Sequence, residues 1–239
     1  MNNFYFILSF SRSGSTLLSK ILNNNKDITV LNETWIFPTL SILRWEKLNY
    51  NKQRYILHIY NESLKIYENC TPVSHNICER RNISFISFYK KILNHNISIT
   101  GEKNPVNTLH FPYLKKNVEN SKFIFLTRNP IAIANSYKNR WLTNEDYNHF
   151  LFQVTKVIKT YFLSYQEYYN DPELITIRYE DLVKDTVGSL NKLCNHLGVN
   201  YDKKMLDNID TFVFKSSSLK SHKDLSKEIH IKNINKYRS

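Results

Sequence analysis

The stretch FYFILSFSRSGSTLLSKIL, residues 4–22, joins an apolar run, a serine-rich turn and an apolar segment with helical spacing. The run Phe4–Phe10 is typical of a buried strand, and Ser15–Asn23 predicts a helix. At such a junction the first N–H groups of the helix have no helical partner, and they carry the positive end of the helix dipole. The stretch therefore predicts an anion-binding loop between a strand and a helix.

The loop residues favour phosphate as the anion. Gly14 permits a tight turn, Ser15 and Thr16 add hydroxyl donors, and Arg12 adds a fixed charge whose fork geometry suits phosphate oxygens. The loop that binds ATP or GTP reads G-x-x-x-x-G-K-[ST]. When Gly14 is aligned with its second glycine, Ser9 stands at the first glycine and Ser15 at the lysine. The lysine that contacts the β- and γ-phosphates is therefore missing.

The rest of the chain alternates short apolar runs with helix-length segments, which predicts an α/β fold with a central parallel sheet and flanking helices. The predicted strands are Phe4–Phe10, Ile28–Leu31, Ile97–Thr100, Lys122–Thr127 and Leu174–Arg178. The predicted helices are Ser15–Asn23, Asn51–Glu68, Ser84–Asn94, Asn107–Lys116, Pro130–Arg140, Asp146–Tyr169 and Asp181–Leu197. Pro130 suits a first helical turn, and Gly198 suits a helix end.

Composition narrows the functional classes. The 239 residues carry a net charge of +12, which indicates either an anionic partner or a solvated basic face. The basic residues are spread along the chain without a compact run or an RNA-binding motif, so we expect no nucleic-acid partner. Three cysteines without a CxxC pair favour a reducing compartment. Because no apolar segment is long enough for a signal peptide or a membrane span, we expect a cytoplasmic protein.

A second anion site is predicted at FIFLTRNPIAIANSYKNR, residues 123–140. Arg128 ends a predicted strand, Pro130 opens a helix, and Ser136 lies about two helical turns later. An arginine at a strand end and a serine inside the next helix can converge on one phosphate. Two phosphate sites without the ATP-loop lysine suit a ligand that carries phosphates at two separate ends.

Three motifs resemble those of sulfotransferases that use 3′-phosphoadenosine 5′-phosphosulfate (PAPS). SRSGSTLL is similar to the family's loop P-R-S-G-T-T-L-L, with Ser11 in place of the usual proline. The segment from Arg128 to Ser136 matches R-[DN]-P-x-x-x-x-x-S. ITIRYEDLVKD resembles the family's R-Y-E-D-L segment and is followed by a similar helix. The resemblance covers residues from about 4 to 200.

This resemblance implies a P-loop-type three-layer fold and a set of donor contacts. The loop residues Arg12, Ser13, Gly14, Ser15 and Thr16 would bind the 5′-phosphosulfate. Arg128 and Ser136 would bind the 3′-phosphate, and Tyr179 would lie near the adenosine. The acids that follow, Glu180 and Asp181, we interpret as structural acids at a helix N-terminus.

Glu33 is the predicted general base. It follows the short strand ITVL, so it should emerge beside the phosphate loop, because parallel strands end at the same edge of a sheet. Burial against Trp35-Ile36-Phe37 would raise its pKa. The stretch LNETWIFP is similar to E-E-T-R-I-I-P of tyrosylprotein sulfotransferases, whose second glutamate is the base. Trp35 replaces an arginine of that segment, so the acceptor need not be the same.

Lys103 is the predicted cation for the leaving group. It stands just past a predicted strand in ITGEKNP, which resembles G-E-K-[TS]-P stretches of bacterial and carbohydrate sulfotransferases. Together with Arg12 it would stabilise the charge that develops during transfer, so no metal is predicted. Small-molecule sulfotransferases of the cytosol have K-x-H instead, with histidine as base, and Pro105 occupies that histidine position here. Glu102 is a weaker alternative base.

We expect one sulfotransferase domain over residues 1–239, with a helical insertion at about 38–96 that forms much of the acceptor pocket. The basic C-terminal segment 215–239 loosely resembles a part of tyrosylprotein sulfotransferases that closes over the cofactor, where Ser217 and Lys227 would contact it. A glycan, a glycolipid or a small metabolite remains open as acceptor, as does the oligomeric state. The alternative functions are a P-loop nucleotide kinase and a non-catalytic polyanion-binding protein.

Overall fold

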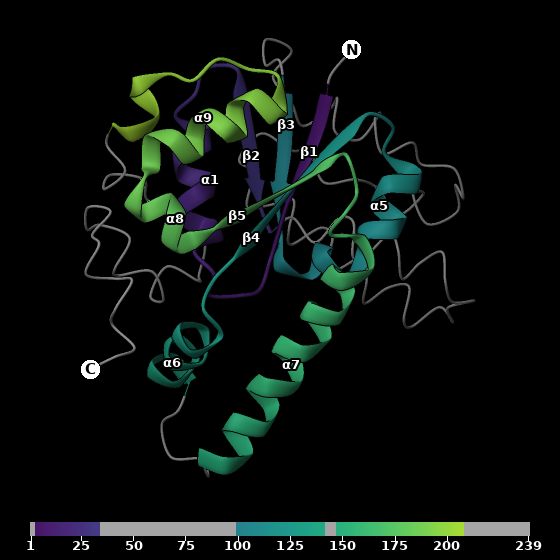
Figure 1. Ribbon diagram of the computed structural model, residues 1–239, viewed down its shortest axis with the longest axis vertical. Helices are drawn as coiled ribbons and strands as arrows, with labels where there is room; N and C mark the ends of the chain where they lie inside the picture. Colours follow the sequence, from purple (N-terminus) through teal and green to yellow (C-terminus); the bar gives the residue numbers. More distant parts are fainter. Residues whose placement is uncertain (1–2, 34–98, 142–146, 208–239) are drawn as a thin grey trace, which may run out of the picture.

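The computed structural model describes residues 3–33, 99–141 and 147–207 (Figure 1). The described residues form a five-stranded sheet in the order β2-β3-β1-β4-β5, and every pairing is parallel. The strands are β1 Asn3–Ser9, β2 Ile28–Asn32, β3 Ile99–Lys103, β4 Ser121–Thr127 and β5 Leu174–Arg178. Between and after them lie α1 Ser15–Asn23, η2 Pro105–His110, α5 Phe111–Asn117, α6 Pro130–Trp141, α7 Tyr147–Tyr168, α8 Tyr179–Lys184, α9 Thr186–Leu197 and η3 Lys203–Leu206.

The register of the sheet brings the carboxyl ends of neighbouring strands together. β1 is central and pairs with β3 up to Ile7–Lys103 and with β4 up to Ser9–Leu126. β2 ends opposite the same lysine. In a parallel α/β sheet, ligands bind outside this edge, so the loops that follow β1, β2, β3 and β4 are the place to look for a site.

Two buried clusters, one on each face of the sheet, make three layers. On β1, Phe4, Phe6 and Leu8 belong to the cluster that includes α5 and α7. Tyr5 and Ile7 alternate with them and belong to the cluster with α1, α8 and α9. Because both faces of the strand are covered, its sequence is a continuous apolar run. The predicted α/β fold with a central parallel sheet and flanking helices is confirmed.

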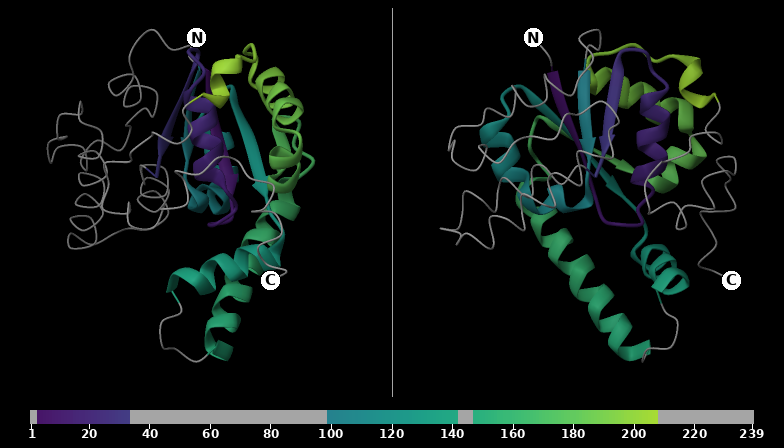
Figure 2. Two further views of the ribbon diagram at one scale, coloured as in Figure 1. Left: turned by 90° about the vertical axis from the view of Figure 1, so that its left-hand side faces the viewer. Right: turned by 180° about the vertical axis from the view of Figure 1, so that it is seen from behind.

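Aromatic pairs attach α7 to β4 of the sheet and to α5. Phe125 and Tyr165 stack with ring centroids 4.2 Å apart, and Phe111 and Tyr168 stack at 4.1 Å. Figure 1 and Figure 2 show that α6 and the amino-terminal part of α7 extend past the carboxyl ends of the strands. The helix that follows β4, α6, therefore lies at the same edge of the sheet as the turn between β1 and α1.

Most predicted elements agree with the structure, and β3 differs in an informative way. The predicted strand Ile97–Thr100 lies at Ile99–Lys103, so Lys103 is the last residue of the strand and not a loop residue beyond it. Hydrogen bonding to β1 and β2 on both sides outweighs the polar character of this stretch. Gly101 is required there, because a Cβ atom would lie 2.2 Å from the Tyr5 ring.

Two predicted helices are each divided. The helix expected at Asn107–Lys116 is the 3-10 helix η2 followed by α5. Pro112 has no N–H and its ring would clash with the carbonyl four residues earlier, so a continuous α-helix cannot cross it. The helix expected at Asp181–Leu197 is divided into α8 and α9, because the Asp185 side chain accepts the Gly188 N–H and caps a new helix. Pro130 begins α6 and Gly198 ends α9 at φ 78°, as predicted.

Several predictions fall outside the described residues. They are the helices Asn51–Glu68 and Ser84–Asn94, the insertion at about 38–96, the segment 215–239, and the site residues Ser217 and Lys227. Within the ranges that the structure describes, no helix combines the length and the apolar character that crossing a membrane requires.

Candidate functional site

The turn between β1 and α1 has the geometry expected of an anion-binding loop. Arg12 and Gly14 have φ values of 70° and 93°, so the chain reverses through two left-handed residues. Gly14 caps α1 without a side-chain hydrogen bond, and the first turn of α1 contains no acidic residue. The helix dipole at this end is therefore not compensated by a carboxylate within that turn.

The hydroxyl of Ser13 is a second sign of a binding loop. Ser13 is fully buried, and its Oγ has no hydrogen-bond partner among the described residues. A buried hydroxyl without a partner costs free energy unless a ligand or a water molecule satisfies it. The loop thus combines an unsatisfied hydroxyl with the positive dipole end of α1, where the first N–H groups of the helix lack helical partners.

Two arginines converge beside this loop. Arg12 Nε donates to Ser136 Oγ of α6 at 3.0 Å, and Arg128 Nη1 donates to the Arg12 carbonyl at 2.9 Å. Arg128 also lies 4.4 Å from the centre of the Tyr179 ring, which is the geometry of a cation–π contact. The structure therefore brings together the arginines, Ser136 and Tyr179 that were predicted from separate motifs.

Tyr179 packs directly on Gly14, in the turn between β1 and α1. It is 7% exposed, and a Cβ atom on Gly14 would lie 2.4 Å from its ring. Burial raises the pKa of Tyr179, whereas Arg128 lowers that pKa and Glu180 raises it. Glu180 and Asp181 lie in the first turn of α8, as we expected. Glu180 Oε1 also accepts the Asn129 N–H at 2.9 Å, just before the start of α6.

Glu33 and Lys103 form an ion pair at the ends of β2 and β3. Lys103 Nζ lies 2.6 Å from Glu33 Oε1, with the lysine side chain 3% exposed and the glutamate side chain 48% exposed. The Glu33 N–H also donates to the Lys103 carbonyl at 2.7 Å, and Glu33 has a left-handed φ of 50°. The expected burial of Glu33 is therefore wrong, and the apolar wall at 35–37 lies outside the described residues.

Glu102, the weaker alternative base, has a different environment from Glu33. It is buried, and its Oε2 accepts Asn107 Nδ2 at 3.1 Å. Successive residues of a strand point to opposite faces, so Glu102 and Lys103 of β3 do not share a face. This arrangement favours Glu33 over Glu102 as the carboxylate that meets solvent beside the lysine.

Sequence reasoning missed a group of buried polar residues in η2 and at its N-cap, directly after Lys103. Asn104, Asn107 and Thr108 are all fully buried. Thr108 Oγ1 accepts the Ser9 N–H at 2.9 Å and donates to the Ser9 carbonyl at 3.1 Å. The available signal was the occurrence of three polar residues within NPVNT, directly after a strand and without an amphipathic helical pattern.

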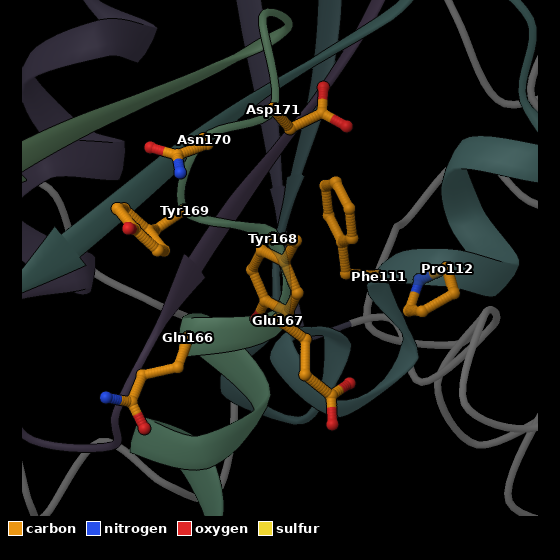
Figure 3. Close-up of a pocket in the computed structure, with 8 residues that line it drawn as sticks. All are labelled: Phe111, Pro112, Gln166, Glu167, Tyr168, Tyr169, Asn170 and Asp171. Atoms are coloured by element: carbon orange, nitrogen blue, oxygen red, sulfur yellow. The ribbon is translucent and has the colours of Figure 1, made fainter.

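A pocket of about 440 Å³ lies between the start of α5 and the end of α7 (Figure 3). Phe111 and Tyr168 stack beside it, and Asp171 at its rim pairs with Lys115. None of the predicted site residues lines this pocket.

The family model and three of the solved structures that match this chain describe sulfotransferases. A family model described as "Sulfotransferase family" matches residues 5–203. The sulfotransferase domain of the Synechococcus PCC 7002 olefin synthase has a TM-score of 0.66 at 21% identity, over 100% of this chain and 88% of its own. The sulfotransferase domain from the curacin biosynthetic pathway has a TM-score of 0.63 at 20% identity, over 100% and 91%. A mouse sulfotransferase complexed with PAP has a TM-score of 0.50 at 19% identity, over 84% and 60%. No curated protein matches the sequence.

Proposed function

The chain belongs to the sulfotransferase family, and we propose that it transfers a sulfuryl group from PAPS to a hydroxyl or amine acceptor. The resemblance found in the sequence motifs is thereby confirmed at the level of the family. The observation that carries the proposal is the group formed by Arg12, Arg128, Ser136 and Tyr179 beside the uncapped N-terminus of α1.

The residues present fit the donor that we propose. The N–H groups of the loop, Ser13 Oγ, Ser15 and Thr16 would hold the 5′-phosphosulfate, because an unsatisfied buried hydroxyl and an uncapped helix end both favour an anion there. PAPS, when bound, supplies an activated sulfuryl group. That the mouse sulfotransferase was solved with PAP supports the same nucleotide here.

The other end of the donor would be recognised by Arg128, Ser136 and Tyr179. Ser136 Oγ accepts a hydrogen bond from Arg12, which leaves its own proton free to donate to a 3′-phosphate oxygen. The carbonyl of Arg12 orients the Arg128 guanidinium through one of its N–H groups, and others can contact the same phosphate. Tyr179 would lie near the adenosine, where its ring, which contacts Gly14 and the Arg128 guanidinium, would hold that arginine in place.

In this proposal Glu33 is the general base and Lys103 the cation at the leaving group. The glutamate is half exposed, so an acceptor hydroxyl can reach the carboxylate and give up its proton. Lys103 is buried, and Glu33 holds its ammonium group at the sheet edge, where it can donate to the bridging oxygen. Arg12 adds positive charge from the loop, and the acceptor would attack in line by analogy with phosphoryl transfer.

The domain organisation, the acceptor and the cellular location are also proposals. We propose one domain in which the segment at about 38–96 forms the acceptor site and Ser217 and Lys227 close over the donor. Transfer without a metal and a cytoplasmic location stay predictions. Carbohydrates, glycolipids and small metabolites all remain possible acceptors. The kinase alternative is disfavoured by Ser15 at the lysine position, and the polyanion-binding alternative by the family match.

Calorimetric titration tests the donor. We expect adenosine 3′,5′-bisphosphate to bind tightly without a metal, and ADP and ATP to bind weakly with or without Mg²⁺. A preference for ATP with Mg²⁺ would support the divergent kinase. Absence of binding by all three nucleotides, with salt-sensitive binding to heparin, would support the polyanion-binding protein.

A further inference from the structure

On the β3 side, the carboxyl end of β1 is held by a side chain and not by the neighbouring strand. The ladder between β1 and β3 ends at Ile7–Lys103, whereas the ladder on the β4 side continues to Ser9–Leu126. Thr108 Oγ1 accepts the Ser9 N–H at 2.9 Å and donates to the Ser9 carbonyl at 3.1 Å. A single hydroxyl thus bonds to both the N–H and the carbonyl of Ser9, beyond the point where the β1–β3 pairing ends.

Thr108 is itself held from two directions. Its carbonyl accepts the Tyr168 hydroxyl at 2.8 Å. Its neighbour Asn107 donates to Glu102 of β3 at 3.1 Å, and the Asn107 N–H donates to the Asn104 carbonyl at 3.0 Å. The threonine is therefore fixed to β3 on one side and to α7 on the other.

Tyr168 can hold Thr108 over a wide pH range. It lies at the end of α7, where its ring stacks on Phe111 at the start of α5 (Figure 3). Burial raises the pKa of Tyr168, and the nearby charges of Glu167, Tyr165 and Tyr161 raise that pKa further. The phenol therefore stays protonated and remains a donor to the Thr108 carbonyl.

We propose that Thr108 is a positioning residue that fixes the phosphate loop relative to the strand end that carries Lys103. Ser9 is the last residue of β1, and Arg12 follows it in the loop, while η2 continues directly from Lys103 through Asn104. The bonds between Thr108 and Ser9 are thus a direct link between the two proposed donor-binding elements. This inference rests on the proposed function for its effect on the donor, although the link itself does not.

The test replaces the hydroxyl and nothing else. Thr108→Val has the same shape and removes both bonds to Ser9, whereas Thr108→Ser keeps the hydroxyl. Because Thr108→Val leaves two buried backbone groups unsatisfied, we expect affinity for adenosine 3′,5′-bisphosphate to fall by roughly tenfold to a hundredfold. Thr108→Ser should stay within about threefold of the wild type. Thr160→Val, an exposed threonine of α7, is the matched control and should have no effect.

A second readout does not depend on the ligand. Hydrogen exchange of residues 9–14, measured by mass spectrometry, should become roughly tenfold faster or more in Thr108→Val. The α9 amides should keep their wild-type rates, and Thr108→Ser should restore slow exchange in the loop. A general loss of stability would instead accelerate exchange in both regions.

The outcomes separate this inference from the proposed function. If the wild type binds no bisphosphate, the proposed donor is wrong, and hydrogen exchange still decides whether Thr108 holds the loop. Wild-type exchange in Thr108→Val, or equal effects of valine and serine, would overturn the inference. If Thr108→Val does not fold, Tyr168→Phe removes only the bond to the Thr108 carbonyl. It should accelerate loop exchange by roughly threefold to tenfold, and an unchanged rate would refute the link.

Discussion

Gly14→Ala is the substitution whose cost can best be worked out from the structure. Gly14 has φ 93°, a backbone conformation that an L side chain rarely adopts, and an added Cβ atom would lie 2.4 and 2.5 Å from Cδ2 and Cε2 of Tyr179. Tyr179 is buried and also contacts the Arg128 guanidinium. The ring therefore cannot move away from the loop without disturbing the arginine that we propose binds the 3′-phosphate.

Two separate costs add in this variant. The left-handed backbone costs roughly 1–2 kcal/mol for a residue with a Cβ atom. Forcing a methyl group against a packed ring costs roughly 1–3 kcal/mol. The free energy of unfolding should therefore fall by about 2–5 kcal/mol. For a domain of this size, that loss lowers Tm by about 4–20 °C.

Gly198→Ala provides a matched control. Gly198 has φ 78°, but nothing lies within 4 Å of the position that its Cβ atom would occupy. It should therefore show the backbone cost of roughly 1–2 kcal/mol without the steric cost. Urea denaturation of both variants isolates the contact with Tyr179 as the difference between them. In a double-mutant cycle, Tyr179→Leu should recover roughly 1–3 kcal/mol of the loss in Gly14→Ala.

The reasoning fails if Gly14→Ala is no less stable than Gly198→Ala, or if Tyr179→Leu recovers nothing. Either result would mean that the Tyr179 ring does not press on the phosphate loop. Tyr179 would then be misplaced relative to the proposed phosphate site.

Three further predictions concern the base, the second phosphate site and pH. Glu33→Gln should keep its affinity for adenosine 3′,5′-bisphosphate but lose turnover by ~10²-fold or more; undiminished turnover would remove Glu33 from the role. Arg128→Ala should weaken binding of the 3′-phosphorylated nucleotide much more than binding of its 3′-hydroxyl counterpart, and equal losses in calorimetry would contradict the assignment. Burial lowers the pKa of His110 and His196 from the ordinary value of 6.5. As pH falls below 6.5, these histidines therefore bind protons more readily in the unfolded chain than in the folded one. The free energy of unfolding should decrease over that range. Urea denaturation at several pH values should show this decrease, and His196→Gln should reduce it.

The features that could be predicted from the sequence alone are those that depend on residues close together in the chain. The loop between β1 and α1 could be predicted because one glycine, an arginine and several hydroxyl residues stand between an apolar run and a helical pattern. Pro130 and Gly198 marked helix ends for reasons that lie within a single turn of chain. Continuous apolar runs predicted strands covered on both faces, since covered strands need no alternation.

Tertiary structure decided what depends on contacts between distant residues. β3 extends to Lys103 because β1 and β2 pair with it on both sides, which no pattern within ITGEK states. The bonds from Arg128 to Arg12 and from Thr108 to Ser9 join residues that are far apart in the chain. Motifs could therefore indicate candidate side chains for the proposed donor site. Only the folded chain brings them together, because hydrogen bonding and burial depend on distance in space and not on separation along the sequence.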